Sequence, residues 1–149
     1  MNVEQRIGLL LKEHGWSLSA AESCTGGRIS HLITTVSGSS SYYLGSVTSY
    51  AVSVKEKVLG VSPSVIENKG VVSSEVAAAM AEGVRRLTGS TFAVATTGLA
   101  EGSDGHYPEG TFTEIFQCEG PRKSNIKRFT TAALRFLEKN IVDYINNCK

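Results

Sequence analysis

The sequence predicts an α/β fold, a three-layer α/β/α sandwich with a mostly parallel mixed sheet, and we expect one domain over residues 1–149. Two observations predict it. Segments with helical apolar spacing alternate along the chain with short β-branched runs, which is the order of strand–helix–strand units. The run TFAVAT at 91–96 is apolar and bounded by turn residues, which is typical of a strand buried on both faces.

The chain begins with a predicted helix and strand. Apolar residues at helical spacing predict an amphipathic helix over about 3–14, and Gly15 follows as a C-cap. A short strand is expected at 16–21. The polar loop 22–27 then leads into a second helical pattern, so it lies between a strand and a helix N-terminus, where free N–H groups gather and anions bind.

The middle of the chain predicts one strand and two helices. Residues 43–53 are rich in Tyr, Val and Thr, which favours a strand, and Lys55 lies just beyond its end. Pro63 at a first helical position starts a short helix. Ser73 can cap a longer helix over 74–87.

The last third of the chain predicts two strands and a helix. The buried strand at 91–96 ends at Thr97, which opens a glycine-containing loop that reaches Gly110. A single strand is expected at 111–118. An apolar stripe then predicts a final helix that packs one face on the core: Ile126, Phe129, Ala133, Leu137 and Tyr144.

Composition excludes several classes of protein. The net charge is +1, and no apolar run approaches the roughly 18 residues of a membrane helix, so we expect no membrane partner. The N-terminus has Glu4 before its apolar stretch and no small-residue cleavage site, so a cytoplasmic protein is expected. The three cysteines form no CxxC pair, which argues against a disulfide framework and a structural zinc site. Residues 122–149 carry a net charge of +5, but the near-neutral chain and the apolar helix stripe make nucleic acid an unlikely partner.

Ser23 is the candidate nucleophile on position alone. It stands at a strand-to-helix turn beside Glu22 and before two glycines, which allow close backbone approach to a ligand. A serine nucleophile needs a base, and the three histidines are expected at the surface. A lysine with a lowered pKa can replace histidine, which makes Lys55 a candidate, although its spacing equally fits the first turn of a solvated helix.

Three other features have a functional and a structural interpretation. Cys24 could be a thiolate nucleophile at a helix N-terminus or a small buried residue. The loop at 97–110 could hold a phosphate or ribose through N–H groups, or serve as a flexible connection. Asp104, His106 and Glu109 could bind a metal, but no second cluster completes a site, so no metal is expected.

Six segments together resemble a known family. They are Ala21–Gly27 (AESCTGG), Ser37–Ser40, Ser49-Tyr50 with Lys55, Leu59–Val61, Gly70–Ser73 and Thr97–Ala100. In this order and spacing they resemble the C-terminal domain family of the competence/damage-inducible protein CinA, whose stand-alone members are nicotinamide-nucleotide amidohydrolases. The resemblance runs from about residue 10 to residue 100 and resumes near residue 120.

The resemblance implies both an activity and a set of site residues. The reaction is hydrolysis of the carboxamide of nicotinamide mononucleotide to nicotinate mononucleotide and ammonia, without a metal or organic cofactor. Ser23 would be the nucleophile, Lys55 the base, and Tyr50 a residue that orients it or relays the proton. Thr97 would contribute to substrate or oxyanion contacts, and the charge of Arg122 would meet the phosphate or help to lower the pKa of Lys55. Seven further residues are implied on the substrate side: Thr25, Gly26, Gly27, Ser40, Thr97, Gly98 and Arg122.

The chain departs from the family pattern in two loops, Leu99–Gly102 and Pro108–Thr111. Between Thr111 and Gly120 it has residues for one strand where the family has two. Either an edge strand is missing, which would leave backbone groups exposed or in need of a partner that covers them, or the sequence as given omits a segment. The family implies a homo-oligomer. The alternative function is a catalytically inactive nucleotide-binding or regulatory domain that keeps the fold.

Overall fold

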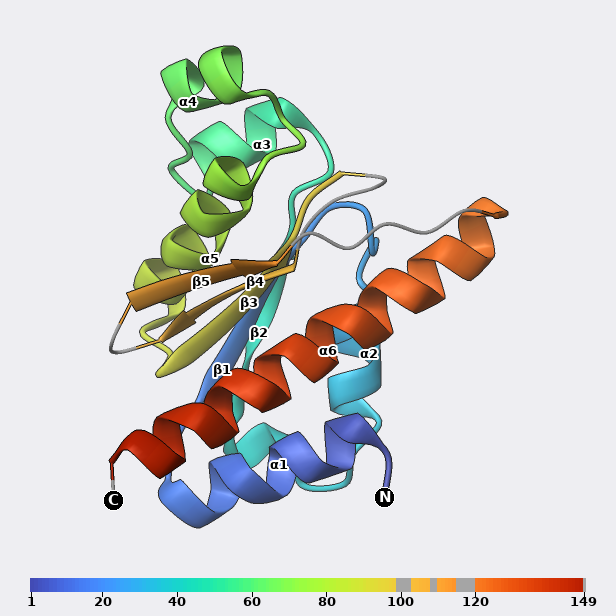
Figure 1. The fold of residues 1–149 in the computed structure, drawn as a ribbon, viewed down its shortest axis with the longest axis vertical. Coiled ribbons are helices and arrows are strands. Elements are labelled where there is room, and N and C mark those ends of the chain that lie inside the picture. Colours follow the sequence, from blue (N-terminus) through green and yellow to red (C-terminus); the bar gives the residue numbers. More distant parts are fainter. Residues whose placement is uncertain (99–102, 108–109, 115–119, 149) are drawn as a thin grey trace.

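The computed structural model describes residues 1–98, 103–107, 110–114 and 120–148, which build one sheet with helices on both faces (Figure 1). The strand order is β2-β1-β3-β4-β5. The strands are β1 (Leu18–Glu22), β2 (Tyr43–Thr48), β3 (Phe92–Thr96), β4 (Ser103–Tyr107) and β5 (Gly110–Glu114). β1 pairs in parallel with β2 and β3, whereas β4 is antiparallel to both β3 and β5. All these strands except β4 therefore run in one direction, which confirms the mostly parallel mixed sheet.

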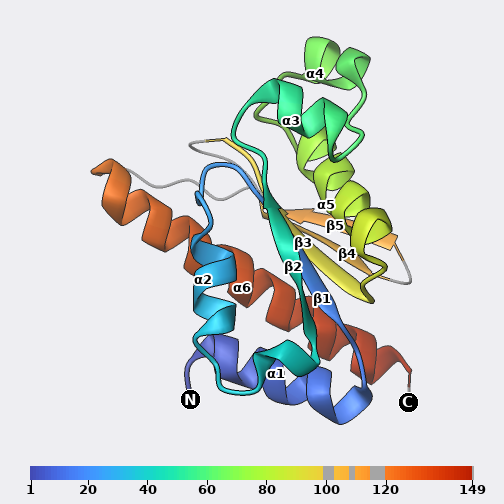
Figure 2. The same ribbon diagram turned by 180° about the vertical axis from the view of Figure 1, so that it is seen from behind.

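The helices form the two outer layers. α1 (Val3–His14), α2 (Arg28–Thr34) and α6 (Arg122–Asn147) cover one face, and α5 (Ser74–Thr88) covers the other (Figures 1 and 2). The short α3 (Val52–Lys57) and α4 (Pro63–Lys69) lie beyond the carboxyl ends of the strands, and the one-turn η1 (Ser39–Ser41) precedes β2. The predicted three-layer sandwich is confirmed. No helix in the part of the chain that the structure describes is long and apolar enough to cross a membrane.

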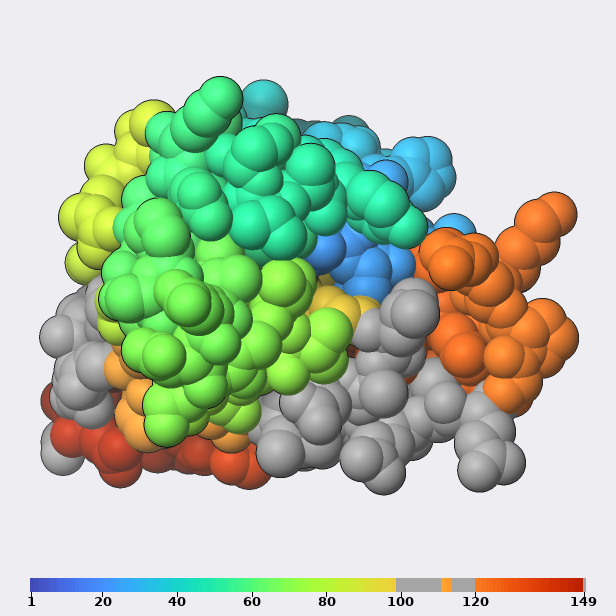
Figure 3. Space-filling view, turned by 90° about the horizontal axis from the view of Figure 1, so that it is seen from above, coloured from blue at the N-terminus to red at the C-terminus, as the bar shows by residue number. Residues whose placement is uncertain are grey.

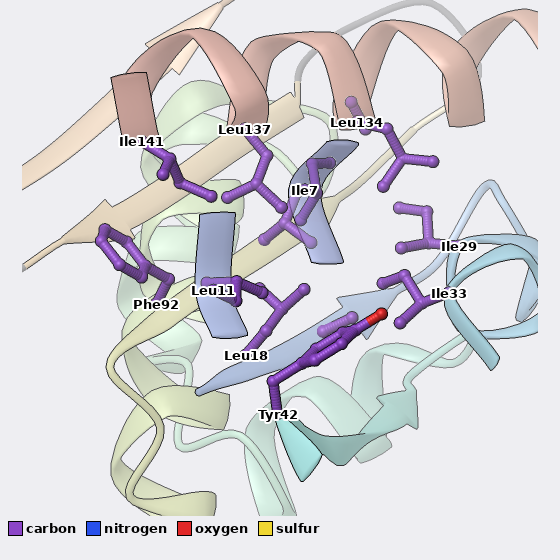
Figure 4. Packing of buried hydrophobic residues seen from close by; sticks show 13 residues of the cluster. Ile7, Leu11, Leu18, Ile29, Ile33, Tyr42, Phe92, Leu134, Leu137 and Ile141 are labelled. Carbon is purple, nitrogen blue, oxygen red and sulfur yellow. The ribbon is translucent and has the colours of Figure 1, made fainter. Parts of the chain in front are cut away.

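Each face of the sheet carries its own apolar core, because successive strand residues point to opposite faces. Leu18 and Ala20 of β1 pack with α1, α2 and α6, whereas Ala21 packs with α5. Figure 4 shows the first core, whose labelled members come from three helices and two strands as well as the residue before β2: Ile7, Leu11, Leu18, Ile29, Ile33, Tyr42, Phe92, Leu134, Leu137 and Ile141. Burial on both faces explains why every residue of β1 and β3 is buried.

The caps predicted at Gly15 and Ser73 are confirmed. Gly15 ends α1 in the left-handed conformation. Ser73 accepts a hydrogen bond from the N–H of Val76 at the start of α5. Both signals depend on neighbouring residues only, so sequence alone located them. The structure adds a reciprocal capping box of Asn2 and Gln5 at the start of α1.

The strand predicted at 43–53 is wrong in its second half. β2 ends at Thr48, and α3 begins at Val52. The reason is the length of the neighbouring strand: β1 ends at Glu22, whose carbonyl accepts the N–H of Ser49 at 2.7 Å. Beyond that point a strand would have no partner for its N–H groups on β1, whereas a helix pairs them internally.

The segment 103–107, predicted as loop, is a strand. β4 pairs with β3 from Ala93↔His106 to Thr96↔Ser103, and β5 continues the sheet as a hairpin partner. β4 lies before Thr111, so the expectation that one of the family's two strands between Thr111 and Gly120 is missing stays a prediction. β4 lacks a hydrophobic pattern, and pairing with the backbone of β3 decides its conformation. The strand predicted at 111–118 is present over Gly110–Glu114, and residues 115–119 lie outside the described residues.

Candidate active site

Ser23 lies in a tight loop at the carboxyl end of β1, an interior strand of the sheet between β2 and β3. The loop closes with hydrogen bonds from the N–H of Gly26 to the carbonyl of Ser23, and from the N–H of Arg28 to the carbonyl of Thr25. Gly26 and Gly27 have φ values of 61° and 101°, which residues with side chains rarely adopt. Seen from above, this loop reaches the surface in blue between the teal segment around α3 and the orange start of α6 (Figure 3). Ser23 itself is 7% exposed.

Lys55 brings a buried amine to the Ser23 hydroxyl. Its side chain is 0% exposed, and Nζ lies 2.9 Å from Ser23 Oγ. Nζ also donates to the main-chain carbonyls of Ser49, at 2.5 Å, and Tyr50, at 3.1 Å. α3 therefore supplies the lysine, and the turn between β2 and α3 supplies the two carbonyls that hold it.

Burial lowers the pKa of Lys55, because a desolvated ammonium is less stable than the neutral amine. An ammonium would donate to all three oxygens. The neutral amine has two N–H groups for the carbonyls of Ser49 and Tyr50, and its lone pair then faces the hydroxyl of Ser23. This arrangement can accept the serine proton.

Glu22 organises the Ser23 loop, although from sequence it stood out only as a neighbour of Ser23. Its buried carboxylate accepts hydrogen bonds from Thr25 Oγ1 at 2.7 Å, from the N–H of Ile29 at 2.8 Å and from the N–H of Ser30 at 3.0 Å. Gly27, at the N-cap of α2, has no side chain to do this. The signal available in the sequence was a helix start with glycine at its cap, which needs an acceptor from elsewhere.

Three more predicted residues lie at the same edge of the sheet. Thr25 is buried and hydrogen-bonds Thr96 Oγ1 at 2.8 Å, at the end of β3. Thr97 is fully buried and donates its hydroxyl hydrogen to the carbonyl of Val71 at 3.0 Å, so that hydrogen is not free for a substrate oxyanion while this bond holds. Gly98 has a φ of 85° and packs against Val72.

Arg122 lies beside the Ser23 loop across a cavity. This cavity of about 210 Å³ is lined by residues of the loop and of the start of α6: Cys24, Gly120, Arg122, Asn125, Ile126 and Phe129. Its lining combines the exposed Arg122 with apolar side chains, and Cys24 places it one residue from Ser23. The cavity suits a ligand with an anionic group and a flat apolar part.

Two predicted residues are placed differently from the rest. Ser40 is exposed in η1, at the opposite end of β2 from Ser49. Because β2 has six residues, Ser40 lies about 20 Å from the Ser23 loop within one chain. Tyr50 reaches Lys55 through its main-chain carbonyl, and its side chain is 67% exposed.

Cys24 is a thiol in this site. Burial raises its pKa to about 11, so it is protonated at neutral pH and does not have the thiolate character of a nucleophile. Among the side chains that the structure describes, no group of three metal-binding residues is present. The side chains of Asp104, His106 and Glu109 lie outside the described part of the chain.

A family model supplies the deciding comparison: the CinA C-terminal domain matches residues 1–141. The chain belongs to the CinA C-terminal domain family. A CinA-like protein of Flavobacterium psychrophilum is 40% identical over 153 residues, covering 94% of this chain and 37% of that protein. A CinA-like protein of Desulfosudis oleivorans is 45% identical over 119 residues, covering 80% of this chain and 29% of that protein. The chain therefore spans about a third of the length of these CinA-like relatives.

Solved CinA structures share the fold. The competence/damage inducible protein CihA from Agrobacterium tumefaciens has a TM-score of 0.86 and 27% sequence identity, with 91% of each chain covered. The competence damage-inducible protein A from Klebsiella pneumoniae has a TM-score of 0.89 and 22% identity, with 95% of this chain and 98% of that chain covered.

Proposed function

We propose that this CinA domain is an amidohydrolase that converts nicotinamide mononucleotide to nicotinate mononucleotide and ammonia, with Ser23 as nucleophile and Lys55 as general base. The single observation that carries the proposal is the 2.9 Å contact between Ser23 Oγ and a fully buried Lys55 Nζ, held by two carbonyls. A lysine in this setting is built to exchange a proton with the serine.

The proposed reaction has two halves that use the same pair of side chains. Ser23 Oγ attacks the carboxamide carbon while Lys55 Nζ takes the hydroxyl proton. Lys55 returns this proton to the amide nitrogen as the C–N bond breaks, so that ammonia leaves and an ester remains on Ser23. Water then attacks the ester carbonyl, again giving a proton to Lys55, and the C–O bond to Ser23 breaks as its hydroxyl is restored. The products are ammonia and a carboxylate.

The surroundings fit the proposed substrate in charge and size. The cavity between the Ser23 loop and the start of α6 offers apolar surface close to Ser23, and Arg122 in its lining offers a cation for the phosphate. Five further proposed substrate contacts lie at the same edge of the sheet, in the loops that follow β1 and β3: Thr25, Gly26, Gly27, Thr97 and Gly98. Ser40 could join them only from a second copy of the chain, so its proposed role depends on the proposed homo-oligomer.

Product formation is the direct test. The purified protein is incubated with nicotinamide mononucleotide, nicotinate mononucleotide is separated by chromatography, and ammonia is assayed. The proposal expects equal amounts of both from the wild type, and at least a 1,000-fold loss of kcat in Ser23→Ala and Lys55→Met. Ser41→Ala, an exposed serine in η1, is the matched control that keeps activity.

The alternative, an inactive nucleotide-binding domain, predicts a different pattern. Ligand would then raise the melting temperature of the wild type without any product. This result from a folded protein would overturn the proposed activity on this substrate.

A further inference from the structure

We propose that Glu22 is the positioning residue of this site: its buried carboxylate fixes the Ser23 loop at proton-transfer distance from Lys55 without touching the reacting atoms. This inference rests on the proposed function for its kinetic test, and on geometry alone for a second test. Glu22 is 0% exposed and takes no part in the proton transfers described above. A fully buried charged group with no part in the reaction needs another purpose, because its desolvation is costly.

The side chain of Glu22 caps the start of α2. Gly27 occupies the N-cap without a side chain, in a left-handed conformation that the loop requires. Both oxygens of Glu22 reach over the loop instead and accept the N–H groups of Ile29 and Ser30. The carboxylate also meets the positive end of the helix dipole. Ser23 lies between Glu22 and the helix that it caps, so this grip sets where the loop can go.

Two hydroxyl groups in series connect the Ser23 loop to β3 by hydrogen bonds. A carboxylate only accepts hydrogen bonds, so the hydroxyl hydrogen of Thr25 is donated to Glu22. The remaining contact, between Thr25 Oγ1 and Thr96 Oγ1, must then be donated by Thr96. The chain of donors runs in one direction, from Thr96 through Thr25 to Glu22, and holds the loop against the central sheet.

The backbone of Glu22 is also connected, through Ser49, to Lys55. The main-chain carbonyl of Glu22 accepts the N–H of Ser49 at 2.7 Å, and the carbonyl of Ser49 accepts a hydrogen bond from Lys55 Nζ. The backbone of Glu22 therefore helps to place the lysine, while its side chain helps to place the serine. One residue sets both ends of the Ser23–Lys55 contact.

A carboxylate is required because three donors converge on it. Glutamine at this position keeps one accepting oxygen and presents an NH₂ group to a main-chain N–H, so two donors would face each other. Glu22→Gln is expected to break the hydrogen bond from the N–H of Ile29 or from that of Ser30 at the start of α2. A displacement of the nucleophile by about 1 Å is enough for a loss of about 100-fold.

The kinetic test compares Glu22→Gln, Thr25→Val and Asn2→Ala with the wild type on nicotinamide mononucleotide. The expected result for Glu22→Gln is a fall in kcat of about 100-fold with KM changed by less than about threefold, and for Thr25→Val a smaller fall of about 10-fold. Asn2→Ala removes a helix cap from α1, away from the Ser23 loop, and is the matched control with unchanged kcat. An unchanged kcat in both site variants, or an equal loss in the Asn2→Ala control, overturns the inference.

The second test does not need the proposed substrate. Hydrogen exchange measured by NMR reports the N–H groups of Ile29 and Ser30, and a fluorophosphonate probe reports the reactivity of Ser23. In Glu22→Gln, exchange at these two amides should be at least 10-fold faster and labelling of Ser23 at least 10-fold slower, with neither changed by Asn2→Ala. Unchanged exchange and labelling overturn the positioning role. If Glu22→Gln fails to fold, Thr25→Val decides by the same readouts. If the wild type makes no nicotinate mononucleotide yet these shifts occur, the proposed function fails and the positioning role stands.

Discussion

Replacing Lys55 with methionine should change how stability depends on pH. Lys55 is fully buried, and burial lowers the pKa of its amine from the ordinary 10.5. In the unfolded chain the amine is solvated and binds its proton up to that ordinary value. Between the lowered pKa and 10.5 the unfolded state therefore binds more protons than the native state, and stability of the wild type rises with pH.

The size of this effect follows from linkage. Each pH unit inside the window adds about 1.4 kcal/mol to the free energy of unfolding of the wild type relative to Lys55→Met. The penalty for burying the lysine is fully present below the lowered pKa and vanishes above 10.5. The lost hydrogen bonds to Ser49, Tyr50 and Ser23 shift the comparison by a constant and leave its slope unchanged.

Urea denaturation at several pH values between 7 and 10 measures this difference. The free energy of unfolding of the wild type minus that of Lys55→Met should increase with pH, with a slope of up to about 1.4 kcal/mol per unit. Lys57→Met is the matched control, since Lys57 lies in the same short helix but is exposed, and its curve should parallel the wild type. A pH-independent difference for Lys55→Met would refute the claim that burial sets the protonation of this amine.

Three further predictions concern neighbouring residues. Cys24, with its pKa raised to about 11, should react with iodoacetamide at pH 8 far more slowly than the exposed Cys148, as peptide mass spectrometry would measure; comparable rates would contradict its burial as a thiol. Gly83→Ala should lower the free energy of unfolding, measured in urea, by about 1–2 kcal/mol. The new Cβ would lie 2.0 Å from the carbonyl oxygen of Leu59, and this clash exceeds the roughly 1 kcal/mol gain in helix propensity. A variant as stable as the wild type would show that the backbone moves apart at little cost. Tyr50→Phe should keep kcat within about threefold, because Tyr50 contacts the lysine through its carbonyl; a loss of 100-fold would show a role for the hydroxyl instead.

Local chemistry made much of the fold predictable. Gly15 and Ser73 act on residues within one turn of themselves, so the end of α1 and the start of α5 were found from sequence. The apolar run before Thr97 is buried on both faces, which its composition indicated. Where conformation depends on a distant partner, the prediction failed: Val52 has a strand-forming side chain, yet it starts a helix because β1 has already ended.

The candidate site shows the same limit. Ser23 and the two glycines after it could be singled out because they share one loop. The burial of Lys55 could not be predicted, since its spacing equally describes a solvated helix, and only the family resemblance favoured a role in the site. Ser40 sits in a motif of that resemblance, yet the parallel strand after it places it at the far end of the sheet. Tertiary distance, which no local pattern encodes, separates these cases.

Covalent trapping tests directly whether hydrolysis proceeds through an ester on Ser23. The wild type turning over nicotinamide mononucleotide is quenched in acid, digested and examined by mass spectrometry, beside Ser23→Ala. An ester of the nicotinate mononucleotide carboxyl group is expected on the peptide that contains Ser23 and is expected to be absent from the variant, with release of one ammonia for each ester formed. Product formed at an undiminished rate by Ser23→Ala, with no ester on any peptide, would contradict it.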